Sequence, residues 1–284
     1  MRKISTFALQ TPCRFPLLSL MHWIGILNIT DDSFSDGGKY LDVSVAMSHA
    51  RALLDAGADY IDVGAAASNV SALPVTAELE RERLRPVIEG LRTAGVKVSV
   101  DTFNPDTQRW CLSQGVDMLN DINGFCHPEI YPALAASSCQ LVVMHSVQGR
   151  GKATLTSWSP SEVWDNILRF FDDRLSALVC AGVDERRLIV DPGMGNFLGS
   201  DPRSSLLVLQ RLPELKRRWG REVYVGLSRK GFLRKIQLPA TDSACSECSE
   251  NLLLTEDIDD ITARWNAFAV AQGADYIRTH VIKK

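Results

Sequence analysis

The chain has 284 residues, of which 45% are hydrophobic, which is enough for the core of one large α/β domain or two smaller ones. A formal net charge of −3 gives no reason to expect nucleic acid or an anionic membrane as a partner. No apolar run reaches the roughly 20 residues of a membrane helix. Seven cysteines and no recognisable secretory leader indicate reduced thiols and a cytoplasmic protein.

Residues 1–20 are predicted to be an N-terminal extension outside the fold. Two basic residues open a mildly apolar run that Pro12, Arg14 and Pro16 interrupt, which argues against a cleaved signal peptide. The first strong strand pattern begins just after Met21. One domain is therefore expected over residues 21–284.

Short apolar runs alternate with amphipathic segments from residue 23 onward. The runs are rich in β-branched residues and bounded by turn residues, as expected for buried strands. The longer segments have apolar residues at helical spacing, and several end at a glycine. Strands are predicted at residues 23–29, 60–64, 96–101, 118–122, 140–145, 187–193, 223–227 and 276–280. Helices are predicted at residues 44–56, 78–94, 105–114, 131–137, 161–181, 204–218 and 259–272.

Eight strands alternating with helices predict a TIM (β/α)8 barrel, although a doubly wound open sheet would show a similar pattern. Closure would bring the first and eighth strands together, with Asn28 near Arg278 and His280. The sequence stops four residues after the eighth strand, so the final helix would be missing. One side would then expose apolar surface unless the N-terminal extension or a second subunit of a homodimer covered it.

Residues 238–257 are rich in serine and cysteine and are predicted to be a long loop insertion. Cys245 and Cys248 have the spacing of half a zinc site. No second cysteine or histidine pair accompanies them, so two unpaired thiols are the favoured interpretation.

Polar residues recur at the predicted carboxyl ends of the strands, the end that carries the active site in a TIM barrel. They are Asn28, Asp62, Asp101, Asn120, Asp121, His145, Asp191, Ser228, Lys230, Arg278 and His280.

Three of these residues suit a flat heterocycle. Asp101, Asn120 and Asp191 supply carboxylate and amide groups that can grip an N–C–N edge such as that of a pterin or a guanine. Lys230 could hydrogen-bond the ring from the opposite side. The strand ends thus predict a site for a planar, nitrogen-rich ring.

A second group suits phosphate. Arg278 and His280 are donors at one strand end, and closure would bring Asn28 beside them. Because Mg²⁺ takes oxygen ligands and keeps phosphate oxygens in its shell, this corner suits pyrophosphate or a Mg²⁺–phosphate group.

Structural explanations compete for several of these residues. Asp62 could cap a helix or bind backbone as readily as touch a substrate. Asp121 follows Asn120 along the strand and should point to the opposite face, so only one of the two enters the barrel mouth easily. His145 could be a satisfied loop histidine, and Arg229 and Lys230 could be solvated charges that open a helix.

Six segments in order resemble the signatures of dihydropteroate synthases, over nearly all of the chain beyond the extension. The resemblance implies condensation of (7,8-dihydropterin-6-yl)methyl diphosphate with p-aminobenzoate, giving 7,8-dihydropteroate and pyrophosphate for folate synthesis. The partners would be these small molecules, with neither nucleic acid nor membrane. The segments are residues 25–38, 99–102, 119–122, 191–195, 228–230 and 278–280.

The resemblance also implies roles for individual residues. Mg²⁺ would be the cofactor, with Asn28 as its ligand, and Arg278 and His280 would bind pyrophosphate beside it. Phe34 and Ser68 would wall the p-aminobenzoate site. The pterin would contact Asp101, Asn120, Asp191 and Lys230, and the wider substrate-binding set adds Ile122, Met144, Gly226 and Phe125.

Two departures distinguish this chain within the resemblance. The second loop, residues 67–71, lacks the arginine of the usual Ser-Thr-Arg-Pro-Gly pattern, which puts an ion pair with Asp36 in doubt. Residues 123–128 and 145–148 resemble the mobile-resistance, sulfonamide-insensitive branch. One hypothesis is that Phe125 narrows the p-aminobenzoate pocket against the bulkier sulfonamides, and the alternative is that it is a core aromatic.

Two other functions fit parts of the pattern. A pterin-dependent methyltransferase would share the pterin-binding residues but would need no pyrophosphate corner. Asn28, Arg278 and His280, which suit such a corner, argue against it. A non-catalytic pterin-binding protein would explain the missing loop arginine and final helix.

Overall fold

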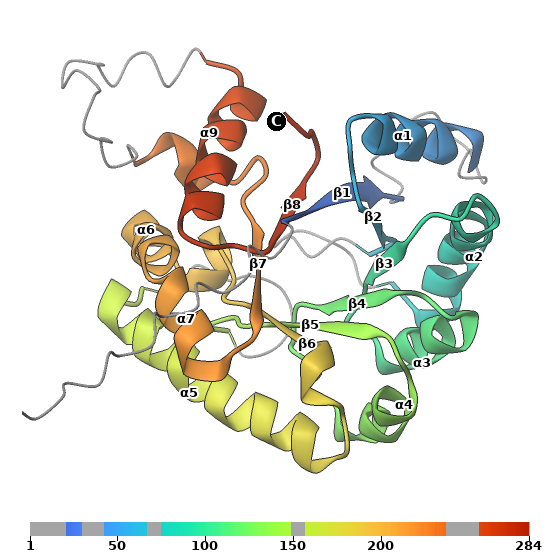
Figure 1. The fold of residues 1–284 in the computed structure, drawn as a ribbon, viewed down its shortest axis with the longest axis horizontal. Helices are drawn as coiled ribbons and strands as arrows, with labels where there is room; N and C mark the ends of the chain where they lie inside the picture. Colours follow the sequence, from blue (N-terminus) through green and yellow to red (C-terminus); the bar gives the residue numbers. More distant parts are fainter. Residues whose placement is uncertain (1–20, 30–42, 67–74, 149–156, 237–255, 284) are drawn as a thin grey trace, which may run out of the picture.

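The computed structural model describes residues 21–29, 43–66, 75–148, 157–236 and 256–283. Eight parallel strands follow one another around a closed barrel, and the helices surround it (Figure 1). The pairing of β1 with β8 closes the barrel and brings Ile24 opposite Arg278. The predicted TIM barrel is confirmed, and the open sheet is excluded.

The strands are short, and most begin and end within two residues of their predicted positions. They are β1 His22–Asn28, β2 Tyr60–Gly64, β3 Val98–Asp101, β4 Met118–Asp121, β5 Gln140–Met144, β6 Leu188–Asp191, β7 Glu222–Gly226 and β8 Tyr276–Thr279. The helices are α1 Val43–Asp55, α2 Ala77–Thr93, α3 Pro105–Gln114, α4 Tyr131–Ala136, α5 Pro160–Cys180, α6 Pro202–Gln210, α7 Leu212–Trp219 and α9 Ile258–Ala271.

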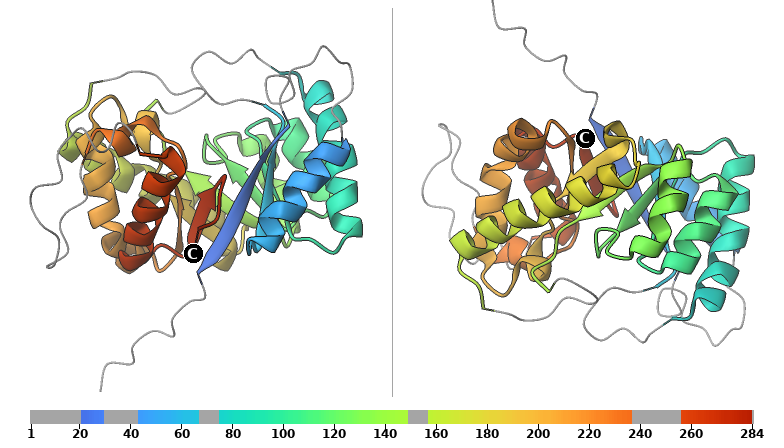
Figure 2. Two further views of the ribbon diagram at one scale, coloured as in Figure 1. Left: turned by 90° about the horizontal axis from the view of Figure 1, so that it is seen from above. Right: turned by 90° about the horizontal axis from the view of Figure 1, so that it is seen from below.

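Apolar side chains form two layers because successive strand residues point to opposite faces of the sheet. The larger layer lies between the strands and the ring of helices. Figure 2 shows the strands and the surrounding helices from two further sides. The smaller layer fills the barrel interior below the mouth. It consists of Ile24, Tyr60, Met118, Val142, Ile189, Tyr224 and Tyr276.

One helix predicted from the sequence is divided into two helices in the structure. The helix expected over residues 204–218 divides at Arg211 into α6 and α7. Pro213 has no N–H to donate, and its ring would clash with the carbonyl of Leu209 in a continuous helix. The single-helix prediction was therefore wrong at a proline visible in the sequence.

Several predictions fall at or beyond the edge of the described chain. Residues 1–20 and 237–255 lie outside it, and with them Cys245 and Cys248. Asp257, at the end of the predicted insertion, caps α9 by accepting from the Asp259 amide at 3.0 Å. No helix follows β8 in residues 280–283, and none of the described helices is long and apolar enough to cross a membrane.

Candidate active site

A polar cavity lies at the carboxyl ends of the strands. Most of the predicted site residues line it. They are Asp101, Asn120, Ile122, Met144, Asp191, Gly226, Ser228, Lys230, Arg278 and His280, together with Ile26, Met194 and Phe197.

Asn120 provides the clearest sign that this cavity receives a ligand. Its side chain is only 3% exposed, and its Oδ1 has no hydrogen-bond partner among the described residues. A buried acceptor without a donor costs about 1–3 kcal/mol, so such groups ordinarily find one. A ligand N–H in the cavity would satisfy Asn120 Oδ1.

Asp191 is held at the end of β6 by the turn that follows it. Its Oδ1 accepts from the Gly193 amide at 2.8 Å. Gly193 has φ +74°, and a Cβ there would lie 2.4 Å from the carbonyl oxygen of His145, so the turn requires glycine. Burial raises the pKa of Asp191 to about 6, with the Gly193 amide and Lys230 opposing the shift.

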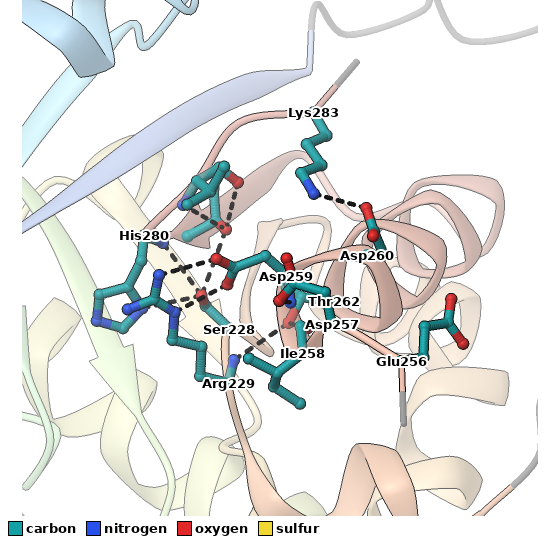
Figure 3. A network of polar contacts seen from close by, with 12 residues as sticks. Ser228, Arg229, Glu256, Asp257, Ile258, Asp259, Asp260, Thr262, His280 and Lys283 are labelled. Atoms are coloured by element: carbon teal, nitrogen blue, oxygen red, sulfur yellow. Dashed lines mark hydrogen bonds and ion pairs between the residues drawn. The ribbon is translucent and has the colours of Figure 1, made fainter. Parts of the chain in front are cut away.

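The backbone at Arg229 turns Lys230 into the cavity. Arg229 has φ +58°, and its guanidinium pairs with both oxygens of Asp259 on α9 at 2.8 and 2.9 Å (Figure 3). Arg229 is thus an anchor rather than a solvated charge. Burial lowers the pKa of Lys230 to about 8, and its Nζ lies 5.2 Å from the centre of the Phe197 ring.

Arg278 lies between two carboxylates. Its Nε donates to Asp62 Oδ2 at 2.6 Å and its Nη2 to Asp101 Oδ2 at 2.8 Å. Burial raises the pKa of Asp101 to about 7, although the charge of Arg278 opposes that shift. Asp62 therefore neither caps a helix nor lines the cavity, because its carboxylate is committed to Arg278 and Ser99.

His280 is a neutral donor or acceptor at neutral pH. Its Nδ1 lies 2.9 Å from Ser228 Oγ, which also accepts from the His280 amide at 3.1 Å (Figure 3). Burial, together with the nearby charge of Arg278, lowers the pKa of His280 to about 4. At this corner Arg278 supplies the positive charge.

Comparison with known proteins agrees with this geometry. The family model described as "Pterin binding enzyme" matches residues 24–280. Dihydropteroate synthase type-3 of Escherichia coli is 47% identical over 259 residues, which are 91% of this chain and 93% of that protein. Dihydropteroate synthase type-2 of Escherichia coli is 45% identical over 90% of this chain and 89% of its own length.

This chain belongs to the dihydropteroate synthase family.

Solved structures of the family have the same barrel. Xanthomonas albilineans dihydropteroate synthase with 4-aminobenzoic acid aligns with a TM-score of 0.77 at 30% identity, over 93% of this chain and 89% of that one. The Anaplasma phagocytophilum enzyme with bound 6-hydroxymethylpterin-monophosphate aligns with a TM-score of 0.75 at 30% identity, over 93% and 94%.

The family resemblance does not place every implied residue at the cavity. Asn28 is exposed at the end of β1 beside Gly64 and is not part of the cavity lining. Phe34 and Ser68 lie outside the described residues. The roles of these three residues remain predictions.

Phe125 lies in the core and does not line the described cavity. Its side chain is fully buried in the layer between strands and helices. Its backbone has φ +55°, and its amide donates to Asp121 Oδ2 at 3.0 Å. These contacts favour the core-aromatic interpretation, so any effect of Phe125 on a ligand would act through the shape of the loop after β4.

Two other polar residues have structural roles. Asp121 points away from the cavity, as its position after Asn120 predicted, and accepts from Gln108 Nε2 at 2.7 Å. His145 is fully buried, with its ring nitrogens 3.1 Å from the Pro192 carbonyl oxygen and 2.8 Å from Asn166 Oδ1. Both are satisfied without a ligand.

Sequence reasoning did not identify Ile26, Met194 and Phe197 as cavity residues. Ile26 lies two positions before Asn28 on β1, and strand alternation was the signal that could have identified it. Met194 and Phe197 belong to the loop after β6, where the pattern gave no direction for a side chain.

Proposed function

We propose that this chain condenses (7,8-dihydropterin-6-yl)methyl diphosphate with p-aminobenzoate, releasing pyrophosphate and giving 7,8-dihydropteroate. The observation that carries the proposal is the unpartnered Oδ1 of Asn120 in a cavity with two carboxylates and a lysine. The solved family structures with bound 4-aminobenzoic acid and 6-hydroxymethylpterin-monophosphate support both substrates.

The pterin would bind through its nitrogen-rich edge. The carboxylate of Asp191 can accept two N–H bonds, and Asn120 Oδ1 needs a donor of that kind. Asp101 lies across the cavity, and Lys230 can donate to the ring carbonyl or a ring nitrogen. Ile122, Met144 and Gly226 would supply wall contacts for the ring.

The diphosphate would lie toward Arg278 and His280. Arg278 carries a charge that stabilises the oxyanion developing on the leaving group, while neutral His280 can donate a hydrogen bond. Asn28 could supply one oxygen ligand to Mg²⁺. One protein ligand would be enough, because Mg²⁺ commonly takes its other ligands from substrate phosphates and water. Bound there, Mg²⁺ would neutralise further negative charge on pyrophosphate.

The reaction itself exchanges two bonds at one carbon. The bond from the pterin CH₂ to the diphosphate oxygen breaks, and a bond from that carbon to the p-aminobenzoate nitrogen forms. The pyrophosphate takes the electron pair of the broken bond, and the nitrogen then loses one proton to solvent. A neutral aromatic amine is already a nucleophile, so the residues of the cavity need only orient the reactants and stabilise charge.

Pyrophosphate release tests this function. Purified protein with the dihydropterin diphosphate, Mg²⁺ and p-aminobenzoate should release pyrophosphate and form dihydropteroate in equal amounts. A methyltransferase would release none, and a non-catalytic binding protein would bind pterin without turnover. Either result would reject the proposal.

We further propose that sulfonamides inhibit this enzyme poorly, because residues 123–128 and 145–148 resemble the insensitive branch. If Phe125 shapes the loop against the sulfonyl group, Phe125→Leu should strengthen sulfonamide inhibition by about tenfold. Phe197→Leu is the comparison, since Phe197 lines the cavity directly. An unchanged inhibition constant in Phe125→Leu would reject a role for Phe125.

Assembly and location remain part of the proposal. A homodimer and a cytoplasmic location are both expected of a folate-synthesis enzyme with free thiols. An apolar groove between the start of β1 and α9 is compatible with the apolar surface predicted beside the eighth strand, and it includes Met21, Trp23, Ala263 and Val270. Sedimentation of the purified protein would give its oligomeric state.

A further inference from the structure

Arg278 bridges two carboxylates, and a ligand in the cavity can reach only one of them. Asp101 lines the cavity and its side chain is 18% exposed, whereas the side chain of Asp62 has no exposed surface. The guanidinium contacts Asp62 through Nε and Asp101 through Nη2. Because two separate nitrogens of one planar group are held, the guanidinium has one orientation.

Asp62 is itself fixed from the neighbouring strand. Ser99, its register partner on β3, donates from Oγ to Asp62 Oδ1 at 2.5 Å. Both oxygens of Asp62 are therefore occupied, one by Ser99 and one by Arg278. Within the described chain, by contrast, Arg278 is the only side-chain partner of the Asp101 carboxylate.

Resting on the function proposed above, we propose that Asp62 is a positioning residue for Arg278. When a pterin takes up the oxygens of Asp101, the bond from Nε to Asp62 keeps the guanidinium at the cavity wall. Arg278 then remains available to the diphosphate, because its position does not depend on its ion pair with Asp101. The buried pair does not touch the ligand and acts only through Arg278.

Two substitutions isolate this role. Asp62→Asn keeps the size of the side chain and removes its charge, so Nε loses a charged acceptor. Arg278→Lys keeps the positive charge but cannot contact both carboxylates in a fixed plane, because an ammonium is a compact point donor. If Asp62 acts through Arg278, the two substitutions remove the same interaction.

The test is a double-mutant cycle on binding of 6-hydroxymethylpterin monophosphate, a pterin that carries a phosphate for Arg278 to contact, measured by calorimetry. Asp62→Asn should weaken binding by about tenfold to a hundredfold, the range of one charged hydrogen bond. In the Arg278→Lys background the same change should cost less than about twofold. Paired instead with Asn120→Ala, which has no contact with Arg278, it should retain its full effect.

Two more variants guard against loss of folding. Ser99→Ala leaves the charge of Asp62 in place and frees one of its oxygens, so it should weaken binding by several-fold, about the worth of one hydrogen bond. Ser204→Ala is the matched control, because Ser204 is fully buried on α6 and its hydroxyl has no partner among the described residues. Its pterin affinity should equal that of the unsubstituted protein.

The outcomes separate this inference from the proposed function. Equal losses for Asp62→Asn in both backgrounds, or normal binding by Asp62→Asn and Ser99→Ala, would overturn the positioning role while pyrophosphate release by the unsubstituted protein upheld the function. Pterin binding without pyrophosphate release would reject the proposed function, while the double-mutant cycle would still test the positioning role of Asp62. No pterin binding by the unsubstituted protein would overturn both.

Discussion

Both ends of the barrel interior bury polar side chains, but the hydrogen-bond pairing of those side chains differs between the two ends. At the amino end, the Tyr60 hydroxyl donates to Gln140 Oε1 and the Tyr276 hydroxyl to Glu222 Oε2, both at 3.1 Å. His22 stacks on Tyr276 with ring centres 5.2 Å apart. Apart from His22 Nδ1 and the Tyr224 hydroxyl, which have no hydrogen-bond partner among the described residues, the polar groups of this floor pair with one another around packed rings.

At the mouth, groups of both charges surround a cavity and are only partly paired. Asn120 Oδ1 has no partner, and burial moves the pKa of Asp191 up and that of Lys230 down, each toward its uncharged form. Burying such groups without full pairing costs stability. The contrast indicates that the floor serves stability and the mouth serves a ligand.

The sharpest test of this contrast is at Lys230. Lys230→Met should weaken pterin binding by about a hundredfold, because the ring loses a charged donor. Burial already disfavours the charged lysine, so the free energy of unfolding at pH 7 should be unchanged or higher. Lys235→Met is the control, since Lys235 is exposed and should change neither quantity. Calorimetry and thermal unfolding measure the two effects.

The second test is pH. Pterin affinity should fall by up to about tenfold as the pH drops from 7 to 6, where Asp101 takes up its proton, and more steeply below pH 6, where Asp191 does so as well, because protonated carboxyls accept fewer N–H bonds. Asp191→Asn should remove the lower part of this dependence. An identical profile in the variant would contradict a role for Asp191.

Stability should follow pH with a sign fixed by the same groups. A carboxyl with a raised pKa in the folded state binds its proton more tightly there than in the unfolded chain. The contribution of Asp101 and Asp191 to the free energy of unfolding is therefore present below pH 4 and lost as the pH rises to about 7. Urea unfolding of Asp191→Asn should show a weaker loss over that interval.

The smallest effect on activity is expected at the floor. Tyr276→Phe removes the hydrogen bonds to Glu222 and Gln140 and should cost about 1 kcal/mol of unfolding free energy. The rate of pyrophosphate release should not change. A large fall in that rate with unchanged stability would break the division between floor and mouth.

Much of the site could be predicted because the barrel converts sequence position into spatial position. Asp101, Asn120, Asp191 and Lys230 each follow an apolar run, and closed parallel strands bring such ends together. Alternation along β4 also separated Asn120 from Asp121. These inferences needed only the strand pattern.

Other features depend on contacts that no local pattern contains. The ion pair of Asp62 with Arg278 joins residues that are 216 positions apart. Arg278 pairs with Asp62 and not with Asn28 because of the direction of its side chain. Phe197 reaches the cavity from a loop whose path the sequence did not determine. Phe125 was placed near a substrate by resemblance, while its burial depends on the packing of α5 and β5 around the preceding turn.

The central claim is that a pterin binds at the mouth, and a crystal structure of this protein with 6-hydroxymethylpterin tests it most directly. The account predicts the ring in the described cavity, with a ring N–H donating to Asn120 Oδ1 and others to Asp191. A ring bound elsewhere, or one that leaves Asn120 Oδ1 without a partner, would contradict it.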